Sequence, residues 1–68
     1  MHHREALRAF EKLGWVQDRQ VGSHIIMVKD GEIASLSVPA KNPIAKGTLR
    51  SLIRSAGITV DEFKNALK

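Results

Sequence analysis

HIIMVKDGEIASLSV, the stretch of residues 24–38, holds two β-prone runs on either side of the dipeptide Asp30-Gly31. An Asp-Gly pair between such runs is the strongest short-range signal for a β-hairpin, because both central residues of the tight turn need a positive φ. Pro39 follows and cannot donate a hydrogen bond to a sheet, so the second run ends there. The stretch predicts two antiparallel strands, over residues 24–29 and 32–38.

A two-residue turn also predicts the register, from Lys29 opposite Glu32 to His24 opposite Ser37. Side chains alternate between the two faces of a strand. One face is uniformly apolar and is the expected core: Ile25, Met27, Ala34, Leu36 and Val38. The other face is mixed: His24, Ile26, Val28, Ile33, Ser35 and Ser37. His24 is therefore expected on the side away from the core.

Apolar residues recur at helical spacing on both sides of this hairpin. Residues 4–13 form one expected helix, which Gly14 ends; its apolar positions are Ala6, Leu7, Phe10 and Leu13. A second helix ends at Gly57, with Leu49, Leu52, Ile53 and Ala56 on its apolar face. Thr59 and Glu62 form a capping-box pattern, which predicts a last helix from about Val60 onward.

Residues 15–21 mix apolar and polar positions in a strand-like way. The expected order is therefore α-β-β-β-α-α, an α+β domain over residues 1–68. A three-stranded antiparallel sheet would carry helices on one face, as in the double-stranded-RNA-binding fold.

The positive charge is concentrated in one segment of the chain. The formal net charge is +4, and no acidic residue lies between Glu32 and Asp61. Four basic residues fall in that interval: Lys41, Lys46, Arg50 and Arg54. The last three are spaced four apart, on one line of the expected second helix. Such a field suits a polyanion, although a solvated basic face is a common alternative.

The composition limits which cellular location and which cofactors are expected. The chain has no cysteine, no apolar stretch of the ~20 residues that a membrane span needs, and no signal-peptide pattern, so a cytoplasmic location is expected. It has no glycine-rich phosphate loop and no cluster of acidic residues, so neither a metal nor a cofactor is expected. His2 and His3 follow Met1 and are expected to be frayed.

Five blocks of the sequence resemble the HicA family of mRNA interferase toxins. They are Gly14-Trp15, Gly22-Ser23-His24, Val38-Pro39, Lys46-Gly47-Thr48-Leu49-Arg50, and Ala56-Gly57-Ile58-Thr59 with Glu62-Phe63. The blocks occur in the family's order over nearly the whole chain. The resemblance implies an RNA-cleaving toxin, a HicB antitoxin as its partner, and His24 as the catalytic histidine, with Gly22 and Ser23 shaping its approach.

Two segments depart from the family pattern. Ile25 and Ile26 follow the histidine, where many members have a second histidine or an aromatic residue. Lys41 and Asn42 stand shortly after Val38-Pro39, where many members have another histidine.

The chemistry of RNA cleavage suits these residues. RNA carries its own nucleophile, the 2′-hydroxyl, so a protein needs to move protons and to stabilise charge on phosphorus. Imidazole moves protons near neutral pH, which assigns the first task to His24. Ser23 and Ser37 are candidates to orient it or the phosphate. Lys41 and Lys46 are candidates to offset the developing charge.

Other functions stay open at this point. A non-catalytic RNA-binding module would hold phosphates with Lys46, Arg50 and Arg54 and leave His24 incidental. A DNA-binding helix pair is weaker, because the second helix is short and lacks base-reading Asn or Gln. On the outer sheet face, Ile26, Val28 and Ile33 form an apolar patch that predicts a protein partner.

Overall fold

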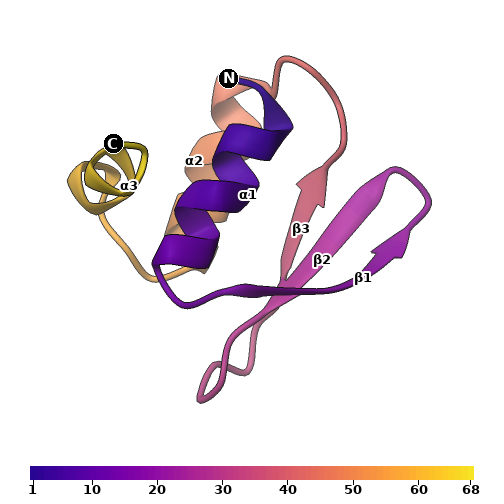
Figure 1. Cartoon of the computed structure of the whole chain (residues 1–68), viewed down its shortest axis with the longest axis horizontal. Helices are drawn as coiled ribbons and strands as arrows, with labels where there is room; N and C mark the ends of the chain where they lie inside the picture. The colour runs from indigo at the N-terminus through magenta and orange to yellow at the C-terminus, as the bar shows by residue number, and fades with distance from the viewer.

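The sheet is antiparallel, with β2 between β1 and β3. The computed structural model describes residues 1–68, and its elements follow in the order α1 (His3–Lys12), β1 (Val16–Val21), β2 (His24–Val28), β3 (Leu36–Pro39), α2 (Lys46–Ser55) and α3 (Val60–Ala66). The helices gather on one side, and the β1–β2 hairpin projects away from them (Figure 1). This confirms the predicted α+β class and the order α-β-β-β-α-α.

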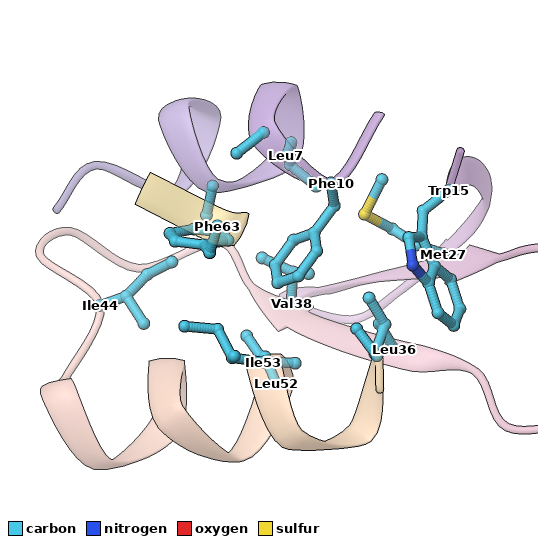
Figure 2. Packing of buried hydrophobic residues seen from close by; sticks show 13 residues of the cluster. Leu7, Phe10, Trp15, Met27, Leu36, Val38, Ile44, Leu52, Ile53 and Phe63 are labelled. Carbon is cyan, nitrogen blue, oxygen red and sulfur yellow. The ribbon is translucent and has the colours of Figure 1, made fainter. Parts of the chain in front are cut away.

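The core lies between the helices and the inner face of the sheet (Figure 2). Its largest fully buried side chains are Trp15, Phe10, Phe63, Met27, Leu36 and Val38. The rings of Phe10 in α1 and Phe63 in α3 lie 5.0 Å apart between centroids, in a tilted arrangement that favours aromatic pairs. This contact ties the last helix to the first.

The tight β-hairpin turn is at Gly22-Ser23, between β1 and β2. Val21 pairs with His24, so the connection has two residues. Gly22 has φ +60°, and no residue other than glycine has a positive φ. A positive φ at the first central position alone is the pattern of a type II′ turn, which favours glycine there. His24 is thus the first strand residue after the turn.

The turn predicted at Asp30-Gly31 forms, but it does not close a two-residue hairpin. The amide of Glu32 donates to the carbonyl of Lys29 at 3.0 Å, and Gly31 has φ +86°. Asp30 lacks a positive φ, which excludes the type I′ turn whose twist would continue the strands. The ladder resumes only at Leu36, so residues 29–35 form a longer loop.

The predicted register is consequently wrong by two residues. His24 lies opposite Pro39 rather than Ser37, Ile26 opposite Ser37, and Met27 opposite Leu36. A shift of two preserves the faces, because side chains alternate with a period of two. Met27, Leu36 and Val38 are therefore buried as predicted and Ile25 packs against the core. Four residues expected on the sheet are instead exposed in the loop: Glu32, Ile33, Ala34 and Ser35.

The helix ends follow local sequence closely. Glu62 N–H donates to Thr59 Oγ1 at 3.1 Å, and Thr59 N–H donates to Glu62 Oε1 at 2.9 Å, which confirms the capping box. Gly57 has φ +72° after α2. Leu52, Ile53 and Ala56 are buried, and Leu49 packs against them. None of the helices has the length and apolar character of a membrane-crossing segment.

The N-terminal histidines are ordered, contrary to the expectation of fraying. His2 caps α1, where its Nδ1 accepts from the amide of Arg4 at 3.1 Å. The amide of His3 donates to Asn42 Oδ1 at 2.7 Å, and His2 Nε2 lies 2.9 Å from Asn42 Nδ2. These contacts join the start of α1 to the loop between β3 and α2.

Candidate functional site

His24 stands at the turn end of the β1–β2 hairpin, on the sheet face that the helices do not cover. It is exposed and begins β2 directly after the Gly22-Ser23 turn. The histidine side chains that form hydrogen bonds within the chain are those of His2 and His3. No neighbouring side chain therefore holds the His24 ring, and both of its nitrogens are open to a ligand.

Backbone contacts fix the position of this end of the sheet. The amide of Ala40 donates to the carbonyl of Ser23 at 2.7 Å, which ties the exit of β3 to the turn. Gln20 Nε2 donates to the carbonyl of Gly22 at 3.1 Å across the same turn. Lys41 follows Ala40 directly, so its exposed ammonium group leaves the sheet at the His24 end. Gly22 and Ser23 form the turn that precedes His24.

Arg19 places a further cation on the same face as His24. The sequence did not indicate Arg19 as a site residue. The pairing shifts between Gln17 and Arg19, and this β-bulge places Asp18 out of register. Arg19 then lies opposite Ile26, which shares the outer face with His24. Its guanidinium is exposed and contacts the Asp18 carboxylate at 2.7 Å. Bulges re-aim side chains next to functional sites, and no local sequence pattern signals this one.

Ser37 lies on the outer face, but it is displaced along β3 from the position predicted for it. It is opposite Ile26, and Pro39 takes the place opposite His24. Directly opposed residues contact most closely, while diagonal neighbours on a face are ~7–8 Å apart. Ser37 is thus a diagonal neighbour of His24, within reach of a substrate that spans both.

The outer face is apolar around His24. Val16 and Val21 of β1 are 56% and 55% exposed, and they lie opposite Val28 and His24. Ile26 and Val28 are partly buried on the same face. Ile33, which was predicted to complete this patch, is fully exposed on the loop after β2 instead. The patch is therefore made by β1 and β2, and Ile33 stands apart from it.

The four basic residues between Glu32 and Asp61 do not form one surface with His24. Lys46, Arg50 and Arg54 are all exposed on α2, as the spacing predicts. Lys46 and Arg50 line a cleft between α2 and α3, on the helical side of the molecule. Of the predicted cations, Lys41 alone leaves the sheet beside His24. No three residues of the types His, Cys, Asp and Glu come together as a metal-binding group.

The fold and this site define a small α+β protein with one accessible imidazole on an open antiparallel sheet. The family model for the HicA toxin of bacterial toxin-antitoxin systems matches residues 3–58, a span that runs from α1 through α2. The chain belongs to this family. It is thus a toxin whose system supplies an antitoxin partner. No individual curated protein gives a significant sequence match.

Proposed function

We propose that this toxin is an endoribonuclease that cleaves messenger RNA with His24 as its acid and base. The exposed, unpartnered imidazole at the end of β2 carries the proposal. Family membership supports a nuclease role at a coarser level. No other histidine is free of hydrogen bonds within the chain, because His2 and His3 are held by the helix cap and Asn42.

The reaction needs one proton-transfer group and no outside nucleophile. The neutral imidazole of His24 takes the proton of the 2′-hydroxyl, whose oxygen attacks the adjacent phosphorus. The bond from phosphorus to the 5′-oxygen breaks, and the imidazolium returns the proton to that oxygen. The products are a 2′,3′-cyclic phosphate and a 5′-hydroxyl. The scheme is independent of metal, because the nucleophile is part of the substrate.

Cations near His24 would stabilise the charge that develops on the phosphate. Lys41 leaves the sheet at the same end, and Arg19 shares the face. Positive groups aimed at developing charge contribute most when they are already in place. Ser23 and Ser37 offer hydroxyl donors to the phosphate or the ribose. The cations of α2 would hold the RNA backbone at a distance from the reacting bond: Lys46, Arg50 and Arg54.

The antitoxin, which we take to be HicB-like, would inhibit by covering the outer face of the sheet. Ile26 and Val28, with the exposed Val16 and Val21, form an apolar patch next to His24. A partner that buries this patch removes it from water and occludes the imidazole at the same time.

The test is a cleavage assay of the purified chain and His24→Ala on one RNA, with folding checked by circular dichroism. The variant should fold, because the side chain is exposed and supports little packing. Its cleavage rate should fall by about 10²–10⁴-fold, the usual contribution of a positioned acid or base. His3→Ala serves as the matched control, because it removes an imidazole that contacts Asn42 within the chain instead of lying open on the sheet.

Three further arms separate cleavage from binding alone. A 2′-deoxy substitution at the scissile nucleotide should block the reaction, chelator should leave it unchanged, and end-group analysis should find the cyclic phosphate. A chain that binds RNA without cutting it would support the non-catalytic module, for which the exposed cations of α2 are sufficient. A His24→Ala variant that cuts at the wild-type rate would remove His24 from the mechanism.

A further inference from the structure

The strongest unexplained feature of the molecule is a cleft of about 250 Å³ between α2 and α3. Each helix supplies residues at the spacing i, i+3, i+4 and i+7. The α2 wall is formed by Lys46, Leu49, Arg50 and Ile53. The α3 wall is formed by Val60, Phe63 and Lys64 with the C-cap residue Leu67, and Met1 completes the lining. The two walls therefore face each other, with two cations and two apolar residues on the α2 side and one cation among three apolar residues on the α3 side.

The cleft has an apolar floor and an open rim. Ile53 and Phe63 are buried, and Figure 2 shows both pointing into the interior from their helices. Val60 and Leu67 are 47% and 37% exposed, so apolar surface continues outward to the solvent. This is the pattern of a groove that receives an apolar side chain, since large hydrophobic groups at a rim gain from being covered.

The charge of the cleft is of one sign. Lys46, Arg50 and Lys64 line it, and no acidic residue does. Two of these cations follow each other on α2 without an intervening acid, and like charges four apart disfavour a helix. An occupant with carboxylates beside its apolar residues would pair with all three cations and relieve that repulsion.

We propose that the α2–α3 cleft is a docking site for an acidic amphipathic helix of a protein partner, separate from the face around His24. An amphipathic helix lays apolar residues at i, i+3, i+4 and i+7 into such a groove. The volume lies below the ~300–1,000 Å³ of typical small-molecule sites and suits one or two anchoring side chains. RNA supplies the negative charge but has no aliphatic side chains to fill the apolar floor.

This docking site is independent of the nuclease proposal, because it involves neither His24 nor the outer face of the sheet. Lys46 and Arg50 nevertheless link the two, since both are also candidate RNA contacts. A bound acidic helix would neutralise them and weaken the hold on RNA without touching the proposed catalytic histidine.

The test uses a synthetic helical peptide with leucine at i, i+3, i+4 and i+7 and glutamate at the flanking positions. Its binding to the full chain is followed by fluorescence anisotropy, and the contacted residues are mapped by amide chemical shifts of the ¹⁵N-labelled protein. The shifts should fall on α2 and α3 and spare β1 and β2. A peptide with each glutamate replaced by glutamine should bind more weakly, and one with each leucine replaced by serine should not bind.

Two variants and a matched control locate the site. Lys64→Glu and Val60→Asp should each weaken peptide binding by about tenfold or more, as expected for contacts at the centre of an interface. Arg54→Glu changes the charge as much as Lys64→Glu, but Arg54 does not line the cleft. Arg54→Glu should therefore change peptide binding by no more than about twofold, well below the tenfold change that corresponds to ~1.4 kcal/mol.

Several results would overturn the proposal. Absence of peptide binding would do so, as would an Arg54→Glu variant as weak as Lys64→Glu, because the attraction would then depend on net charge alone. Shifts confined to the sheet would move the site to the face around His24. Binding to vesicles of phosphatidylglycerol and phosphatidylcholine without binding to the peptide would assign the cleft to a membrane surface instead.

Discussion

At the scale of single residues, His24 is exposed because of the turn before it and because successive side chains of a strand alternate between the two faces of the sheet. Gly22 and Ser23 reverse the chain, and the next side chain points away from Ile25, which packs against the core. The carbonyl of Ser23 accepts from Ala40, so the position of His24 is fixed by backbone rather than by side-chain contacts. We therefore expect the fold to survive the loss of this imidazole.

Arg19 provides the residue-scale prediction. Arg19→Ala should lower the cleavage rate at saturating RNA by about tenfold, the effect of removing ~1.4 kcal/mol of transition-state stabilisation. The reason is that the bulge at Asp18 brings this guanidinium to the face of His24. Single-turnover cleavage measures it, with Arg19→Lys expected to restore part of the rate.

Arg4→Ala is the control for Arg19, because Arg4 is an exposed arginine on α1. If Arg19→Ala and Arg4→Ala changed the rate equally, the guanidinium on the sheet would have no special role.

At the scale of elements, the β1–β2 turn and the first turn of α2 differ in what they require of glycine. Gly22 has φ +60°, and a Cβ added there would meet no atom within 4 Å. Gly47 lies in the first turn of α2 with a helical backbone and similar free space. A side chain therefore has room at both positions, and only the backbone conformation distinguishes Gly22 from Gly47.

We expect Gly22→Ala to lower the free energy of unfolding by about 1–2 kcal/mol, the cost of a left-handed conformation for an L-residue. Gly47→Ala should raise it by about 0.4–1 kcal/mol, because alanine loses less backbone entropy on folding. Urea denaturation of both variants measures the difference. Equal effects of the two substitutions would show that the turn conformation assigned to Gly22 is not required.

At the scale of the whole molecule, the cations fall into two regions. Arg19 and Lys41 lie with His24, while Arg50 and Arg54 lie on the helical side. Figure 1 shows α2 beginning at the end of the molecule where β3 leaves the sheet and running away from it. An RNA strand contacting both regions would pass around this end of the domain.

Replacing both Arg50 and Arg54 by alanine should weaken RNA binding similarly for different sequences. The slope of log affinity against log salt should become shallower by about 1.4, as expected for two lost phosphate contacts on a single strand. Titrations at several salt concentrations measure it. The double variant Arg4→Ala, Arg8→Ala removes the same charge from α1, and an equal change of slope there would show that no specific phosphate contacts are lost.

The outer face gives the second prediction at this scale. Val21→Asp should weaken antitoxin binding by about tenfold or more, because a charge would be buried in the contact. Val60→Asp is its matched control, since this valine is similarly exposed but lies on the helical side. Calorimetric titration of the purified antitoxin compares them. A complex that leaves His24 open to RNA, or one weakened only by Val60→Asp, would contradict occlusion.

The sequence by itself determined the order of the elements and the faces of the residues that pair in the sheet. Helical spacing of apolar residues located α1 and α2, and Thr59 with Glu62 located the start of α3, because these signals are read within one or two turns of chain. The inward position of Met27 and the outward position of His24 also followed, since they depend only on the alternation of side chains between the two faces of a strand. The resemblance carried by Gly22-Ser23-His24 was likewise available from the residues.

Only the tertiary structure decided which residues lie opposite one another. The two-residue connection formed at Gly22-Ser23 rather than Asp30-Gly31, although Gly-Ser between β-prone runs is itself a hairpin signal. The register of β3, the bulge that brings Arg19 to the outer face, and the cleft joining Arg50 to Lys64 all depend on pairing between distant segments. Local sequence limits such pairing to a few registers, and packing of β3 against the helices selects among them.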